Sequence, residues 1–169
     1  MKINGFLIFL LSIISNFCFA QNEIEFREAF TLKLPVDSTQ FYQQEVNKSK
    51  YFVKDNILQI YPGEHLFLEA EVKGNDIQSM KVVKENKNPA KTIEIEFSQN
   101  VSGRKSEGMI LKVSNPFNKK LNYNTMMYIV GRNEWIKTSI IPIQPKLKNF
   151  EMWNDVIISL VLNHWRLEE

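Results

Sequence analysis

The sequence predicts an all-β protein with eight to ten short strands, the pattern of a sandwich or a barrel, and we favour a single antiparallel β-sandwich. Three observations lead to this fold class. Apolar and polar residues alternate through most of the chain, as in residues 92–97 (TIEIEF) and 121–130 (LNYNTMMYIV). Pro, Gly, Asn and Asp residues that favour turns recur between these runs. No long run shows the 3.6-residue periodicity of an amphipathic helix.

The first 20 residues are expected to be a cleaved signal peptide. Lys2 supplies a positive start, residues 6–14 form a short apolar stretch, and Cys18 and Ala20 place small residues before a cleavage site at Gln21. The apolar stretch is shorter than the roughly 20 residues of a membrane-spanning helix. We therefore divide the chain into a signal peptide, residues 1–20, and a β-sandwich domain, residues 21–169. The protein is expected to be exported, to a periplasm or to the extracellular space.

Cys18 is the one cysteine of the chain, and it lies within the predicted signal peptide. A lipid-modified cysteine is the alternative, but Asn16 and Phe17 stand where that signal has small residues. Removing 20 of the 169 residues leaves 149, enough for a core without disulfides. Loss of Lys2 leaves 20 basic against 19 acidic residues, and this balance argues against nucleic acid or a membrane surface as partner.

Residues 23–34 form the first predicted strand, with apolar residues on one face and Glu28 as the exception that marks a bulge or a sheet edge. Asp37 and Gln40 resemble a helix start, so residues 37–46 are expected to hold a turn or two of helix. Residues 51–60 predict a hairpin with its turn at residues 54–56.

Alternation predicts further strands at residues 66–73, 80–83 and 92–97, with a polar loop at residues 84–91. Residues 98–108 (SQNVSGRKSEG) are polar and lack periodicity, so a mobile loop is expected there.

Residues 108–135 are expected to form three consecutive antiparallel strands, with turns at Asn115-Pro116 and at residues 131–134. A strand at residues 135–143 and a loop or single helical turn at residues 150–155 follow. The last strand, residues 156–167, is apolar on both faces at its start, which predicts a central position covered on both sides.

The run MILKVSNPFNKKLNYNTMMYI, residues 109–129, resembles the strand–turn–strand unit of bacterial secreted immunoglobulin-like accessory domains. The resemblance covers this unit alone. It implies a β-sandwich of the immunoglobulin-like type and carries over no catalytic or binding residue.

The sequence offers little for catalysis. It lacks a G-x-S-x-G motif, no cysteine lies beyond Cys18, and His65 and His164 are the two histidines. We therefore expect no enzyme, no catalytic residue and no cofactor. The two histidines have no spacing typical of zinc ligands, and we expect no metal site, although a carboxylate-rich calcium site stays open.

Four strand carboxylates, Glu69, Glu71, Glu94 and Glu96, suggest the enzymatic alternative. If their strands were neighbours, paired carboxylates could serve glycoside hydrolysis. The competing interpretation is that they keep the wet face of the sheet soluble, paired across strands with Lys73, Lys81 or Lys112.

Aromatic residues gather in the last part of the chain and are the binding candidates. They are Tyr128, Trp135, Phe150, Trp153 and Trp165. Exposed, they would form a platform for sugar rings or a protein contact; the alternative is packing in the core. We expect a non-catalytic module that binds another envelope or secreted protein, or a glycan. A small hydrolase or sugar-active enzyme and a structural envelope-assembly protein are the alternatives, and the sequence leaves the oligomeric state open.

Overall fold

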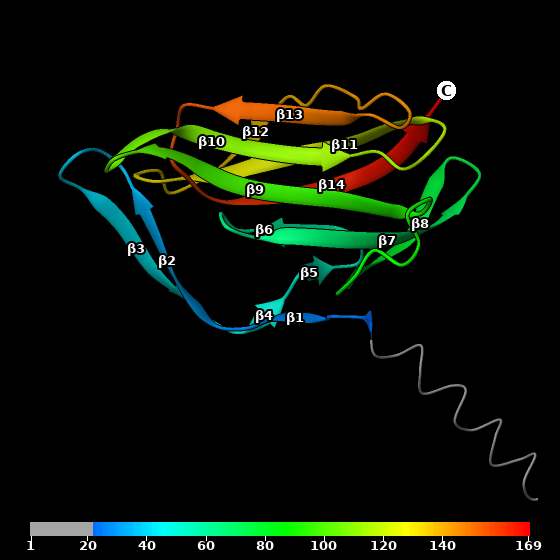
Figure 1. Ribbon diagram of the computed structural model, residues 1–169, viewed down its shortest axis with the longest axis horizontal. Helices are drawn as coiled ribbons and strands as arrows, with labels where there is room; N and C mark the ends of the chain where they lie inside the picture. The colour runs from blue at the N-terminus through cyan, green and yellow to red at the C-terminus, as the bar shows by residue number, and fades with distance from the viewer. Residues whose placement is uncertain (1–21) are drawn as a thin grey trace, which may run out of the picture.

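The computed structural model describes residues 22–169, so the predicted signal peptide lies outside the described residues. Within them the chain is almost entirely β-strand, and every strand pairing is antiparallel, which confirms the all-β prediction (Figure 1). The strands are β1 (Phe26–Arg27), β2 (Phe30–Pro35), β3 (Phe41–Val46), β4 (Ser49–Lys50), β5 (Phe52–Lys54), β6 (Ile57–Ile60), β7 (His65–Lys73), β8 (Asp76–Val83), β9 (Thr92–Ser102), β10 (Lys105–Ser114), β11 (Lys120–Ile129), β12 (Trp135–Thr138), β13 (Lys148–Trp153) and β14 (Ile157–Glu168).

The strands build two layers of a sandwich-like fold. The front layer in Figure 1 has the order β13-β10-β9-β7-β8, and the back layer has the order β12-β11-β14-β6-β5. A single register contact between Arg166 of β14 and Asp76 of β8 joins the two layers into one continuous hydrogen-bonded path. The sheet therefore folds over on itself, and its two inner faces meet.

One hydrophobic core fills the space between the layers. It combines residues from the front layer, such as Ile95 and Leu111, with residues from the back layer, such as Leu121 and Leu160, all of them fully buried. The alternation expected at residues 109–113 and 121–129 appears in their burial, because every second residue of both runs is buried, and this decides which face of each strand is inward. Burial of this alternating set is what orients the outer residues toward solvent.

The β2–β3 hairpin packs on the back layer and forms a second, smaller core, visible at one end of the layers in Figure 1. Leu32, Leu34 and Val46 of the hairpin contact Ile158 of β14. The helix expected at residues 37–46 is wrong. The Asp37 carboxylate accepts hydrogen bonds from the backbone N–H groups of Thr39 and Gln40, each at 2.8 Å, and so closes the hairpin turn instead of starting a helix.

The first strand is interrupted where Glu28 stands. Glu28 and Ala29 separate β1 from β2, and the Glu28 side chain is exposed and paired with Lys48. Arg27, placed on the polar face by alternation, is buried instead. Its guanidinium bonds Glu64 at 2.8 Å and lies over the rings of Tyr51 and Tyr61. These contacts of Arg27 hold the N-terminal segment against the rest of the domain.

Two segments expected as loops are strands. Residues 98–108 continue β9 and begin β10 as a hairpin, with Gly103 in the left-handed region at φ +63. Residues 148–153 form β13 on the edge of the front layer. The two predictions failed for different reasons. Residues 98–108 are polar because much of this hairpin faces solvent, whereas in β13 the apolar side chains of Phe150 and Met152 face solvent, so alternation marks no buried face there.

Residues 108–135 do form strands, but they are not three consecutive paired ones. β10 pairs with β9 and β13, whereas β11 pairs with β14 and β12. The Asn115-Pro116 turn therefore crosses between layers. Buried Asn115 holds this crossing, because its Nδ2 donates to the carbonyls of Lys119 and Ile143, at 2.7 and 3.0 Å, and its Oδ1 accepts from Phe117 N.

The last strand, β14, is central as predicted. It lies between β11 and β6, and residues 157–160 are all buried. None of the helices within residues 22–169 has the length and apolar character needed to cross a membrane.

A candidate binding groove beside β11 and β14

A groove of about 580 Å³ opens where the edge strand β12 ends. β12 pairs with β11 from Trp135–Tyr128 to Thr138–Thr125, and then the chain leaves the sheet. It rejoins β11 only at Leu121, through two 2.9 Å backbone hydrogen bonds with Ile143. The β11–β14 groove, as we name it, lies between these contacts and is lined by Asn122, Tyr123, Asn124, Thr125, Met126, Lys137, Thr138, Ser139, Ile140, Asn163, His164 and Arg166. Its size falls in the ~300–1,000 Å³ range of ligand pockets.

A β-bulge in β14 shapes one wall of this groove. Asn122 faces Arg166 and Asn124 faces Asn163, so two residues of β14, His164 and Trp165, oppose one residue of β11. His164 takes the left-handed backbone conformation, φ +53, which costs a residue with a side chain about 1–2 kcal/mol. Bulges of this kind redirect side chains beside functional sites.

The bulge has a clear effect on side-chain direction. Trp165 turns into the core, while Asn163, His164 and Arg166 line the groove. A backbone strained at a solvent-facing residue is more common at binding sites than elsewhere. The strained backbone at His164 therefore favours this wall of the groove as a binding surface.

Hydrogen bonds hold the charged groups of the wall in place. Arg166 Nε donates to Glu168 Oε1 at 2.9 Å, and Asn122 Nδ2 donates to the same oxygen at 3.0 Å. The hydrogen bond from Asn122 has the larger effect and that from Arg166 the next, and both lower the pKa of Glu168. This carboxylate therefore stays charged and orients Arg166. His164 Nδ1 lies 2.5 Å from Asn163 Oδ1.

Two lining residues carry hydroxyls without a partner. Tyr123 Oη and Thr125 Oγ1 are buried and accept or donate no hydrogen bond among residues 22–169. Burial raises the pKa of Tyr123 well above its usual range, so its hydroxyl stays neutral and keeps its proton. An unsatisfied buried polar group costs about 1–3 kcal/mol. Natural cores contain few such groups, and two on adjacent inward positions beside one groove are unusual.

An aromatic pair continues the outer face of β11 beyond the groove. The rings of Tyr128 and Trp135 lie 5.3 Å apart with an angle of 36° between their planes. Because side chains alternate along a strand, Tyr128 points to the same side of β11 as Met126 and Asn124. Four residues of strand separate Tyr128 from Asn124, a distance of about 13 Å. Trp135 is 39% exposed, whereas Tyr128 is half-buried against the second core, so the accessible face of this aromatic shelf is that of Trp135.

The structure thus brings together two of the five aromatic candidates and separates the other three. Trp165 is buried, stacks on Tyr123 at 4.7 Å and donates its indole N–H to the Asn56 carbonyl. Trp153 is half-buried against the main core, with its N–H bonded to Thr138 Oγ1 at 3.2 Å. Phe150 is exposed on the outer face of the front layer, opposite Lys112 in register. A single five-residue platform is therefore not formed.

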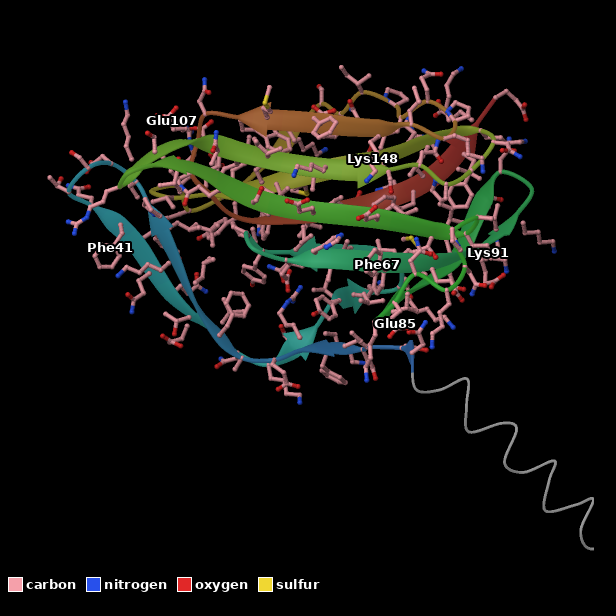
Figure 2. The ribbon with its side chains drawn as sticks, in the orientation of Figure 1. Phe41, Phe67, Glu85, Lys91, Glu107 and Lys148 are labelled. Carbon is pink, nitrogen blue, oxygen red and sulfur yellow. The ribbon has the colours of Figure 1, made fainter. Side chains whose placement is uncertain are left out.

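The strand carboxylates are all paired on the face of the front layer, over which Figure 2 shows Phe67 and Lys148. The ion pairs are Glu69–Lys81, Glu71–Lys91, Glu94–His65, Glu94–Lys148 and Glu96–Lys112. Burial favours the neutral form of Glu94, but hydrogen bonds from Lys148 and His65 outweigh it and lower its pKa.

Lys81 and Lys112 are confirmed as cross-strand partners, whereas Lys73 makes no ion pair within the described residues. The space beside Glu94 and Glu96 is only about 20 Å³. Glu94 and Glu96 therefore border a space much smaller than a ligand pocket. In the described part of the chain, no three His, Cys, Asp or Glu side chains gather as metal ligands.

Sequence reasoning missed the polar part of the groove. The alternation already placed Asn122 and Asn124 on the same side of the strand as Tyr128, and two asparagines on an outward face were the available signal. The alternation did not indicate which strand pairs with β11. Asn163, His164 and Arg166 come from 40 residues further along the chain and reach the site only through the β11–β14 pairing.

Comparison with protein-family models, with curated proteins and with solved structures finds no match to this chain. The interpretation of the groove therefore rests on its geometry and chemistry. These describe a sandwich-like antiparallel domain with a lateral polar groove and an adjoining aromatic shelf.

Proposed function

We propose that this protein is a non-catalytic glycan-binding domain whose ligand lies in the β11–β14 groove and extends onto the Tyr128–Trp135 shelf. The observation that carries the proposal is the continuity of the two features: amide side chains and aromatic rings lie on one side of β11, about 13 Å apart. A compact ligand does not span this distance, whereas an oligosaccharide chain can contact both the amide side chains and the aromatic rings.

The chemistry of the lining supports a sugar ligand. Asn122, Asn124 and Asn163 each offer an amide N–H₂ donor and a carbonyl acceptor, which matches hydroxyls that donate and accept. Flat aromatic surface such as the exposed face of Trp135 binds the apolar face of a sugar ring with little loss of entropy.

The same lining supports binding without catalysis. No Asp or Glu lines the groove, and the neighbouring carboxylate, Glu168, is bonded to Arg166 and Asn122. His164 contacts the Asn163 amide, and no Ser, Thr or Cys nucleophile lies within hydrogen-bond distance of either ring nitrogen in residues 22–169. A general base needs such a contact with the group it deprotonates. A protein partner remains the second candidate, supported by the exposed Phe150 and Met152 of the edge strand β13.

We also propose that the protein is exported and that its sandwich is of the immunoglobulin-like type. The support for export is the leader pattern of residues 1–20. Expression of the full chain in a secreting host, followed by N-terminal sequencing of the exported product, tests this point. Gln21 is expected as the first residue; an intact Met1 on the exported protein would contradict cleavage.

A glycan array probed with the exported protein tests the proposed function. Binding to at least one oligosaccharide is expected, and Trp135→Ala and Asn124→Ala are each expected to weaken it about tenfold, the effect of about 1.4 kcal/mol. Phe150→Ala is the matched control, because Phe150 is an exposed aromatic residue of the opposite layer. The proposal fails if no glycan binds, or if Phe150→Ala weakens binding as much as Trp135→Ala does.

A further inference from the structure

We infer that the groove selects acidic glycans, extended sugar chains that carry more than one carboxylate or sulfate group. The inference rests on the proposed function and adds the ligand class. Its basis is the charge of the lining: Lys137 and Arg166 both face the groove, and no carboxylate does. The protein as a whole is nearly neutral, so this one-sided lining is a local feature.

Lys137 carries the strongest part of the inference. It lies on the edge strand β12 opposite Met126, and it makes no ion pair or hydrogen bond within the part of the chain that the structure describes. Four lysines of the front layer differ from it, because Lys81, Lys91, Lys112 and Lys148 pair with strand carboxylates, whereas Lys73 of the same layer resembles Lys137 in making no ion pair within the described residues. An ammonium group has three donors and no acceptor, so an anionic oxygen is its best partner.

Arg166 supplies a second cation at the other end of the groove. Its Nε bonds Glu168 and its Nη1 donates to the His164 carbonyl at 3.3 Å, which leaves Nη2 without a partner among residues 22–169. Glu168 and Asp76 lie beside Arg166 outside the lining and offset part of its charge. Arg166 is therefore a positioned donor, and Lys137 provides the larger uncompensated charge.

The spacing of these cations suits an extended acidic ligand. Lys137 faces Met126 and Arg166 faces Asn122, so the two cations attach to points about 13 Å apart along β11. A chain with acidic groups on successive sugars can contact both cations, while an adjoining ring lies on the Trp135 shelf.

Isothermal titration calorimetry on the exported full-chain product tests the inference with four probes: tetragalacturonate, its fully methyl-esterified form, a heparin-derived tetrasaccharide and a single-stranded oligonucleotide of matched charge. At least one acidic saccharide is expected to bind, and tetragalacturonate or the sulfated chain is expected to exceed the neutral ester about tenfold. Preference for the carboxylate or the sulfated probe identifies the source of the anion. Added salt is expected to weaken the acidic probes and to leave the ester unchanged.

Substitutions test whether the residues lining the groove cause the preference for acidic saccharides. Lys137→Gln is expected to reduce the ratio of acid to ester affinity about threefold or more, whereas Lys54→Gln, an exposed lysine of β5 outside the groove, leaves it unchanged. Equal affinity for acid and ester overturns the inference and leaves glycan binding standing. If neither acidic saccharide binds, the inference is also overturned. If the oligonucleotide binds with the same affinity as the best saccharide, the groove is a general polyanion-binding surface instead. Loss of all saccharide binding, on the array as well, removes the proposed function.

Discussion

Replacing His164 by glycine is expected to stabilise the protein while weakening ligand binding. His164 has φ +53, where a residue with a Cβ atom loses about 1–2 kcal/mol relative to glycine. Glycine recovers that strain but gives the unfolded chain more freedom, which costs about 0.5–1 kcal/mol. The His164 side chain is exposed and its one hydrogen bond is to the neighbouring Asn163, so its removal costs little. The net expectation is about 0.5–1 kcal/mol of added stability.

Urea unfolding measures this difference. With a slope of about 2 kcal/mol/M, the midpoint is expected to rise by roughly 0.25–0.5 M at an unchanged slope. His164→Ala is the matched control, because it removes the imidazole and keeps the Cβ atom; its midpoint is expected at or below that of the natural protein. A glycine variant no more stable than the alanine variant would refute the assignment of backbone strain to this bulge. Both variants are expected to bind the glycan more weakly.

Three further predictions concern contacts elsewhere in the fold. Arg27→Met is expected to destabilise by about 3–5 kcal/mol in urea unfolding, because it leaves Glu64 uncompensated in a buried site; adding Glu64→Gln should recover part of the loss, and an additive double variant would contradict this. Tyr123→Phe keeps the ring stacked on Trp165 and removes an unpaired hydroxyl, so the melting temperature should stay equal or rise; a clear fall would show that the hydroxyl has a partner. Glu94 has a lowered pKa in the folded protein, so its contribution is present above its ordinary pKa near 4.5 and is lost as the pH falls through the folded value. Glu94→Gln should therefore reduce the loss of stability on acidification from pH 5 to pH 3, and an unchanged acid profile would count against the Lys148 and His65 contacts.

The local pattern of the chain predicted the faces of most strands. In residues 92–97 the apolar set, Ile93, Ile95 and Phe97, is buried as predicted, because a strand between core and solvent must alternate. The pattern failed where that condition does not hold. Residues 98–108 form a polar hairpin end, and β13 lies on a sheet edge with Phe150 exposed.

The candidate site was predicted in part. Tyr128 and Trp135 were among the proposed binding residues, and the structure pairs them on one face. Trp165 was proposed with them, yet the bulge at His164 turns it into the core, and no local pattern signals a bulge of one residue. Phe150 and Tyr128 are both aromatic residues on an outward face. They belong to opposite layers, and the strand pairing is what separates them.

The sequence by itself determined that the described chain is all-β, that residues alternate between two sides of the long strands, and that the charge is close to neutral. Each of these depends on residues that are neighbours along the chain. Only the tertiary structure decided that β10 and β11 separate into different layers, that Arg27 is buried, and that β14 joins β11 with a bulge. Strand pairing joins segments tens of residues apart through backbone groups that all residues share, so side-chain patterns contain little information about it. The β11–β14 groove is a product of that pairing.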